Sequence, residues 1–338
     1  MPGLLSSCAC ESRVRRTLLM AAAGGLALAT PLRSLAQPAA RVPRVGFLGA
    51  DAASARVKDA FLQGLRALGR VEGRNVAVDW RFADGRYERL PGLAAELVRL
   101  KVDVIVAVTT LCVQAARQAT ATIPIVMVGV PDPVGEGFAT SLSRPGGNIT
   151  GLSNIVTEVS SKHLELMLAA VPRLSLVAVL INPGNPSDAL ILEQIQGAAY
   201  TRRVKVLPVE AGTAGQLEAG FAEIARARAQ AVIVAADPYF DVQRDLVIRL
   251  AIDNRLPTIF SSREMTEAGG LMSYGQDLAE HYRRAATYVD RLLKGAKAGS
   301  LPIEQPTVLE FVVNRGTAKA LGLAIPRELE LRADRVID

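Results

Sequence analysis

The sequence predicts an α/β protein made of two doubly wound lobes, each with a largely parallel sheet covered by helices on both faces. Two observations lead to this fold class. Between residues 43 and 147, short apolar runs alternate with segments whose apolar residues recur at helical spacing, in the order β-α-β-α-β-α-β. The same alternation starts again near residue 160 and continues to about residue 260. The length of 338 residues suits two domains.

The first repeat supplies four predicted strands joined by predicted helices. Apolar residues recur at helical spacing over residues 57–68 and 87–98, and a third helix is expected to start at Thr109 and Thr110 and to run through Gln118. The polar turn Val130–Pro133 ends the last strand and is expected to be followed by a short helical segment. The predicted strands are Arg44–Gly49, Asn75–Phe82, Val102–Val108 and Ile123–Val130.

The second repeat follows the same plan, and a tail breaks it. The predicted strands are Leu176–Ile181, Val204–Val209, Ala231–Ala236 and Leu256–Phe260, and the predicted helices are Ser160–Val171, Ser187–Tyr200, Leu217–Arg228 and Asp241–Asn254. The tail supplies a short strand within Gly269–Gly275, a long amphipathic helix over residues 278–293, a loop Gly295–Pro302, a strand Thr307–Asn314, a short helix Arg315–Leu321 and a last strand Ala333–Ile337. Such a tail has to rejoin both halves.

Residues 1–36 are predicted to be an export signal. Basic residues at Arg13, Arg15 and Arg16 precede the apolar run Leu18–Ala29, and small residues at Ser34 and Ala36 fit cleavage after Ala36. The apolar run is short for a membrane span, although an uncleaved anchor is the alternative. The segment also resembles a twin-arginine signal, so the export route stays open. The predicted location is therefore periplasmic, as a soluble protein after cleavage.

Charge and cysteine content narrow the function classes. The formal charge is +6, half of it within residues 1–40, and no run of five basic residues occurs. An extended nucleic-acid surface needs clustered positive charge, so nucleic acid is not an expected partner. Only Cys112 follows the predicted signal, which rules out an internal disulfide after cleavage. We expect Cys112 to be a buried apolar residue, with a reactive thiol as the alternative.

Several motifs make the chain similar to a known family. The longest runs from Asp132-Pro133-Val134-Gly135 through Ser141-Leu142-Ser143-Arg144-Pro145-Gly146-Gly147-Asn148 to Gly151. Further motifs cover Gly269–Gly275, Arg284–Gly295, Leu301–Thr307 and Ala318–Leu323. Together they resemble the ABC-transporter substrate-binding proteins of the tryptophan/tyrosine-uptake-like family over about residues 43–338.

The resemblance implies a type I periplasmic-binding-protein fold, in which two Rossmann-like lobes are joined by a three-crossing hinge. The crossings are expected near residues 148–153, 273–277 and 301–306. Lobe 1 would then comprise residues 43–149 plus 276–302, and lobe 2 residues 150–275 plus 303–338. A small solute would bind between the lobes, and an ABC permease in the membrane would be the protein partner of a monomeric receptor.

Ligand contacts in this fold come from the carboxyl ends of strands and the starts of helices. The resemblance places an acid for a ligand ammonium at Asp237, with a helix N-cap as the alternative role. Thr109 and Thr110 could donate to a carboxylate or cap the next helix. The other predicted contacts at these strand ends are Asp51, Val130, Asp132, Asn182, Tyr239, Phe240 and Ser261. Helix capping is the alternative role of Asp132, and packing is the alternative role of Tyr239 and Phe240.

The expected function is a solute receptor that closes on its ligand, with an amino acid or related carboxylate as the ligand class. Pro238-Tyr239 stands where amino-acid binders would have small polar residues, which leaves the ligand itself open. A sensory module with the same fold is the alternative. An exported enzyme is less favoured, because no nucleophile motif or cofactor loop occurs. No metal or cofactor is expected: His163 and His281 lie far apart in sequence without neighbouring ligands.

Overall fold

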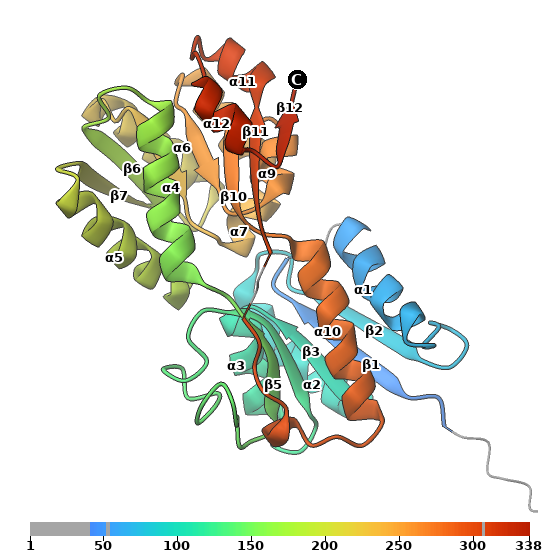
Figure 1. Ribbon diagram of the computed structural model, residues 1–338. Coiled ribbons are helices and arrows are strands. Elements are labelled where there is room, and N and C mark those ends of the chain that lie inside the picture. The colour runs from blue at the N-terminus through green and yellow to red at the C-terminus, as the bar shows by residue number, and fades with distance from the viewer. Residues whose placement is uncertain (1–40, 52–54, 306–307) are drawn as a thin grey trace, which may run out of the picture. The chain divides into compact units, whose positions relative to one another are not determined.

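The computed structural model describes residues 41–51, 55–305 and 308–338 (Figure 1). The predicted export signal, residues 1–36, lies outside the described residues. Two sheets organise the remainder, one with the strand order β2-β1-β3-β4-β5 and one with the order β12-β11-β10-β9-β8-β6-β7. Helices cover both sheets, so the predicted α/β class with two parallel-sheet lobes is confirmed.

All strand pairs of the first sheet are parallel. Its strands are β1 (Arg44–Gly49), β2 (Ala77–Phe82), β3 (Val104–Val108), β4 (Ile125–Val130) and β5 (Ile149–Ser153). Strand β3 is buried along its whole length, as its uninterrupted apolar sequence predicts. Because β2 and β3 lie on opposite sides of β1, the connections diverge between β1 and β3, which is where sheets of this kind bind ligands.

Helices of the first lobe cover both faces of this sheet. They are α1 (Ala55–Ala67), the 3-10 turn η1 (Tyr87–Arg89), α2 (Leu90–Arg99), α3 (Thr110–Ala119) and α10 (Leu278–Leu293). Val104 and Val106 of β3 pack in the cluster formed by α1 and α10, whereas Ile105 and Ala107 pack in the cluster formed by α2 and α3. Full burial of a side chain such as Phe61 in α1 contributes about 1.5–3 kcal/mol.

The second sheet is parallel except where β10 meets β11. Its strands are β6 (Leu176–Ile181), β7 (Lys205–Glu210), β8 (Ala231–Val234), β9 (Thr258–Phe260), β10 (Met272–Gln276), β11 (Leu309–Asn314) and β12 (Arg335–Ile337). Here the connections diverge between β6 and β8, because β7 and β8 lie on opposite sides of β6.

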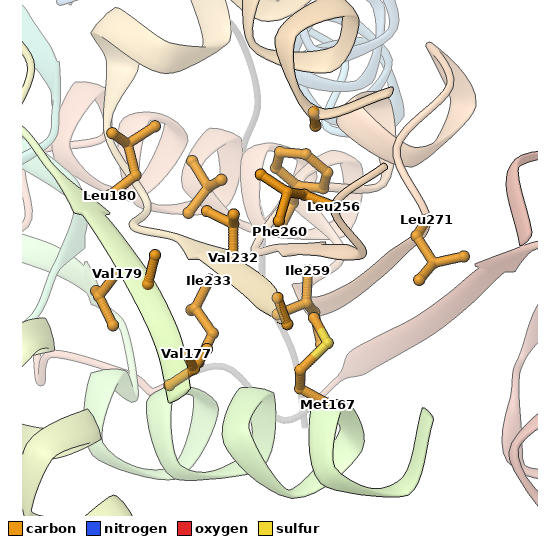
Figure 2. Close-up of a cluster of buried hydrophobic side chains, with 14 of the residues drawn as sticks. Met167, Val177, Val179, Leu180, Val232, Ile233, Leu256, Ile259, Phe260 and Leu271 are labelled. Carbon is orange, nitrogen blue, oxygen red and sulfur yellow. The ribbon is translucent and has the colours of Figure 1, made fainter. Parts of the chain in front are cut away.

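Eight helices accompany the second sheet within the described residues. They are α4 (Val156–Ala170), α5 (Pro186–Thr201), α6 (Ala214–Ala227), α7 (Pro238–Val242), α8 (Arg244–Asp253), α9 (Arg263–Glu267), α11 (Arg315–Ala320) and α12 (Arg327–Arg332). Figure 2 shows the core: Ile233 and Ile259 point to the side of Met167 from α4, while Val232 and Phe260 point to the opposite side. This alternation is the period of two expected of a strand buried on both faces.

Two sequence expectations about elements are wrong, and two short helices were missed. The segment after Val130–Pro133 consists of turns and irregular chain, because two prolines and the left-handed Gly137 (φ 66°) prevent a helix. The helix expected at Asp241–Asn254 begins at Pro238 and is divided at Gln243 into α7 and α8, because the Asp237 carboxylate accepts the Tyr239 N–H and starts a helix there. The short helices α9 and α12 were not expected.

The chain passes between the two sheets three times. The first connection leads from β5 to α4, and the second from β10 to α10, which packs on the first sheet. The third leaves the first sheet at Glu304, which forms a bridge with Leu152, and enters the second sheet at β11. Within the described residues, no helix combines the length and the apolar character needed to cross a bilayer.

Candidate functional site

A cavity of about 590 Å³ lies where the strands of both sheets end. The first lobe contributes Asp51 after β1 and Thr109 after β3, and the second lobe contributes Phe240 after β8 and Ser261 after β9. The volume falls in the range of pockets that enclose small molecules. Because each sheet places the carboxyl ends of its strands at this edge, residues distant in sequence meet in one site.

Thr109 reaches this site in a strained backbone conformation. Its φ of 80° and ψ of 161° lie in a region that is otherwise almost confined to glycine, at a cost of roughly 1–3 kcal/mol. Two contacts hold it there: its N–H donates to the Val128 carbonyl at 2.9 Å, and its Oγ1 approaches Cys112 Sγ at 3.8 Å. Strain of this kind is concentrated at ligand sites.

Cys112 itself has the buried character expected from the sequence. Burial raises the pKa of its thiol to about 12, so the group stays protonated and unreactive at neutral pH.

Carboxylates dominate the polar lining of the cavity. The first lobe contributes the carboxylates of Asp51 and Asp84, and the second lobe contributes those of Asp241 and Glu264. Arg244 is the single arginine or lysine among the described lining residues. Burial raises the pKa of Asp51 to about 6, and burial together with the neighbouring Asp51 and Glu264 raises the pKa of Asp241. A positively charged ligand group would relieve this concentration of negative charge.

One of these carboxylates already takes part in a contact between the lobes. Arg56 of α1 donates from Nη1 to Glu264 Oε1 at 3.0 Å and from Nη2 to Asp277 Oδ1 at 3.0 Å. Asp84 is also paired, because Arg89 Nη1 donates to its Oδ2 at 2.8 Å. Asp51 and Asp241 have no basic partner among the described residues, and these two carboxylates are therefore the ones available to a cationic group.

Two histidines and several aromatic rings form the remainder of the wall. Burial lowers the pKa of His163 and of His281 to about 4, so both are neutral at pH 7. His163 Nε2 lies 2.6 Å from the Tyr274 carbonyl oxygen, which can only accept, so this nitrogen carries the proton. Phe240, Phe260 and Tyr282 supply the apolar rings. No cluster of metal-ligating side chains occurs among the described residues.

The structure brings four of the ten sequence-predicted site residues to the cavity lining: Asp51, Thr109, Phe240 and Ser261. Val130 is fully buried in the core of the first lobe, and Asp132 is exposed, where its carboxylate accepts the Gly135 N–H at 2.8 Å. The other four, Thr110, Asn182, Asp237 and Tyr239, are not among the lining residues.

Asp237 is the centre of a hydrogen-bond network at the divergence point of the second sheet. Its carboxylate accepts from Tyr87 Oη of the first lobe at 2.9 Å, from Asn182 Nδ2 at 3.0 Å, from Asn185 Nδ2 at 2.8 Å and from the Tyr239 N–H at 2.8 Å. Burial raises its pKa although these donors oppose the shift. In this arrangement Asp237 therefore caps α7 and joins the lobes through Tyr87.

Thr110 makes a third contact between the lobes. Its Oγ1 lies 3.1 Å from Ser187 Oγ at the start of α5. The Tyr239 hydroxyl, in contrast, is buried without a partner among the described residues.

Sequence reasoning missed six lining residues with carboxylate, guanidinium or imidazole side chains. Asp84 follows the end of β2, so the rule that strand ends supply ligand contacts could have found it. Glu264 lies in the unpredicted helix α9, and Asp241 and Arg244 lie where one longer helix was expected. His163 and His281 were noted only as isolated histidines, because nothing in the sequence indicates that α4 and α10 face one cavity.

Two α/β lobes, three connections and a cavity at the strand ends together define a two-lobed solute-binding protein of the type I periplasmic-binding fold. The family model described as ABC transporter substrate binding protein matches residues 45–337. The chain therefore belongs to that family, and the resemblance seen in the sequence is confirmed.

Known relatives and solved structures agree with this assignment. The tyrosine-binding protein of Clostridioides difficile (strain R20291) is 26% identical over 268 residues, which is 79% of this chain and 77% of that protein. A conserved domain protein of Vibrio cholerae is 27% identical with a TM-score of 0.83, covering 88% of this chain and all of the other. The ABC domain from Streptococcus pneumonia, solved in complex with L-Trp, is 22% identical with a TM-score of 0.79 over 87% of this chain and 99% of the other.

Proposed function

We propose that this chain is the extracytoplasmic receptor of an ABC importer and that it captures an amino acid or a related carboxylate between its lobes. The observation that carries the proposal is the cavity itself, which combines unpaired carboxylates from both lobes with apolar and aromatic walls. The two named relatives, one described as tyrosine-binding and one solved with L-Trp, support an aromatic amino acid.

Each part of an amino acid has a complementary group in the cavity. The ammonium would lie between Asp51 and Asp241, where it would offset the repulsion between them. The hydroxyls of Thr109 and Ser261, and the free N–H groups at the start of α3, would donate to the carboxylate. The rings of Phe240 and Tyr282 would contact the side chain.

Closure would follow from contacts with both lobes at once. A solute that bridges Asp51 of the first lobe and Asp241 of the second stabilises the arrangement in which the two approach, and so shifts the population toward it. The hinge would comprise the three connections, which follow β5, β10 and Glu304. The closed, periplasmic, monomeric receptor would then present both lobes to its membrane permease.

Calorimetry with L-tryptophan and L-tyrosine tests the proposal. We expect binding by at least one of them, and loss of binding for indole-3-propionate, which keeps the ring and the carboxylate but lacks the ammonium. Asp241→Asn should weaken binding by about 10- to 100-fold, because a charged hydrogen bond contributes about 1.5–3 kcal/mol.

Asp132→Asn serves as the matched control, because Asp132 is exposed and away from the cavity lining. It should bind as the unaltered chain does. If neither these two nor any other amino acid binds, the proposed ligand class is wrong. If the ammonium-free analogue binds equally well, the role given to the carboxylates is wrong.

A further inference from the structure

Arginines in a left-handed conformation recur at the end of the second sheet that lies opposite the cavity. Four connections there lead from a helix into a parallel strand: α4–β6, α5–β7, α6–β8 and α8–β9. Each contains one arginine with positive φ: Arg173 (64°), Arg203 (57°), Arg228 (56°) and Arg255 (53°). All four side chains are exposed.

Helix geometry alone does not account for arginine at these positions. A chain that leaves a helix through the left-handed region usually does so at glycine, or at asparagine. A residue with a Cβ atom costs roughly 1–2 kcal/mol in that conformation. The second lobe accepts this cost four times, and each time it gains an exposed positive charge.

The four connections are neighbours in space. Strands β9, β8, β6 and β7 are consecutive in the sheet and parallel, so all of them begin at the same end. The side chain of Gln230 joins two of the connections: its Oε1 accepts the Ser175 N–H at 2.7 Å, and its Nε2 donates to the Arg173 carbonyl at 3.3 Å. The arginines therefore form one surface.

Three more basic residues enlarge this surface, and little negative charge balances it. Arg202, Lys205 and Arg226 are exposed in the same connections or at their borders, which brings the basic residues to seven. None of the seven forms an ion pair with a residue that the structure describes. We count each connection from the last residue of its helix to the first residue of the following strand. Over the four connections, Asp253 is the single acidic residue. We call this surface, residues 173, 202, 203, 205, 226, 228 and 255, the basic end.

An exposed aromatic side chain accompanies the charges. Tyr200, in the last turn of α5, is 86% exposed and precedes Arg202 by two residues, and Ile252 at the end of α8 is 39% exposed. Tyrosine beside basic residues is characteristic of the headgroup region of a membrane, where the ring meets the interface and the cations meet lipid phosphates.

We propose that the basic end binds the surface of a membrane containing anionic phospholipids. The cavity lies at the carboxyl ends of these strands and the basic end at their amino ends, so lipid contact leaves the cavity accessible. Each basic residue close to an anionic surface strengthens binding about fivefold, which corresponds to about 1 kcal/mol. Binding should fall as salt rises, because the charges are exposed. This inference does not depend on which solute occupies the cavity.

Glycine substitutions provide a test that preserves the fold. The variant Arg173→Gly, Arg203→Gly, Arg228→Gly, Arg255→Gly removes four charges at positions whose backbone glycine adopts without strain. Cosedimentation would use vesicles of phosphatidylcholine with or without phosphatidylglycerol. Residues 1–36 are themselves basic and apolar. Mass spectrometry of the N-terminus therefore checks that all the proteins compared either retain these residues or lack them.

The unaltered chain should bind only the vesicles that contain phosphatidylglycerol. The four-glycine variant should bind them roughly 600-fold more weakly, at about fivefold for each charge removed. The matched control removes the same charge elsewhere, by Arg66→Gln, Arg74→Gln, Arg99→Gln and Arg327→Gln, all exposed and without a described ion pair. It should keep most of the binding. Tyr200→Ser should weaken binding with no change in charge.

Four results would overturn the proposal. They are an absence of binding to anionic vesicles, an equal loss in the control variant, binding to heparin or duplex DNA as tight as to the vesicles, and a lower melting temperature of the four-glycine variant with vesicle binding unchanged. The last result would show that the arginines serve only to stabilise the carboxyl ends of helices. If the four-glycine variant fails to fold, Arg202→Gln with Lys205→Gln and Arg226→Gln gives the same test without altering a left-handed position.

Discussion

Asp188 is a buried carboxyl group with an incomplete set of hydrogen bonds. Its Oδ2 accepts the Asn182 N–H at 2.8 Å, whereas its Oδ1 is buried without a described partner. Burial raises the pKa of Asp188 to about 8, with a smaller contribution from the nearby Asp237 carboxylate. The neutral acid is therefore the form that the folded protein prefers at pH 7.

This residue should make the folded protein less stable as pH rises above 6.5. An aspartate with a raised pKa stabilises the fold fully below its unfolded value of about 4, and this contribution disappears as pH rises through 8. His163 and His281, whose pKa values are lowered to about 4, act oppositely, but most of their effect is complete by pH 6.5. Between pH 6.5 and 8 the free energy of unfolding should therefore fall by about 1–2 kcal/mol.

Chemical denaturation of Asp188→Asn at pH 6.5 and 8 measures this contribution. The amide has no charge to bury, so the fall should become smaller. The carboxyls of Asp51, Asp237 and Asp241, whose pKa values burial also raises, account for the part that remains. Asp245→Asn, which alters a carboxylate exposed on α8, should keep the fall. An undiminished fall in Asp188→Asn would mean that another group is responsible.

At the scale of elements, a single glycine controls how closely α1 approaches α10. A Cβ atom on Gly64 would lie 2.8 Å from Ala286 Cβ and 2.8 Å from the Arg283 carbonyl oxygen. Contacts this short require the helices to separate. The packing of α10, which follows the second connection, on the first lobe therefore depends on the small size of residue 64.

Gly64→Ala should destabilise the protein although alanine favours helix. The gain in helix propensity is about 1 kcal/mol, while overpacking at a helix contact costs about 1–3 kcal/mol. Gly197→Ala is the control, because Gly197 is exposed in α5 and a Cβ atom there meets nothing within 4 Å. Denaturant midpoints should fall for the first and rise for the second. A rise for both would show that α1 and α10 adjust without cost.

At the scale of the whole molecule, polar contacts between residues that the structure describes join the lobes directly, outside the three connections. Tyr87 Oη donates to Asp237, Thr110 Oγ1 lies beside Ser187 Oγ, and Arg56 pairs with Glu264. The Tyr87 contact joins η1 of the first lobe to the start of α7 in the second. Interactions of this kind set the balance between arrangements of the lobes.

Tyr87→Phe should shift that balance toward separated lobes. It keeps the ring and removes the hydroxyl, which donates to Asp237 and accepts the Tyr239 N–H. Each lost hydrogen bond of about 1 kcal/mol lowers the ratio of joined to separated arrangements about fivefold. Small-angle X-ray scattering should show a larger radius of gyration. Tyr200→Phe, at the exposed tyrosine of α5, should leave the scattering curve unchanged. Equal curves for all three proteins would contradict a role of Tyr87 in joining the lobes.

The sequence by itself determined the fold class and most of the elements. Apolar runs such as Val104–Val108 and the helical spacing in α10 depend on local burial, which residue type and spacing express directly. Motifs at residues 132–151 and 269–275 identified the family before any geometry was considered. The rule that strand ends carry ligand contacts was sufficient to place Asp51, Thr109, Phe240 and Ser261 at the cavity.

Only the tertiary structure decided which polar groups are free and which are already paired. Asp237 looked like the ligand's acid in sequence, yet Tyr87 and two asparagines from other segments occupy its oxygens in this arrangement. Asp84, Asp241 and Glu264 lie apart in sequence, and His163 and His281 lie on helices of different lobes, yet one cavity collects them. These features depend on pairings between distant segments, which a local pattern of residues does not encode.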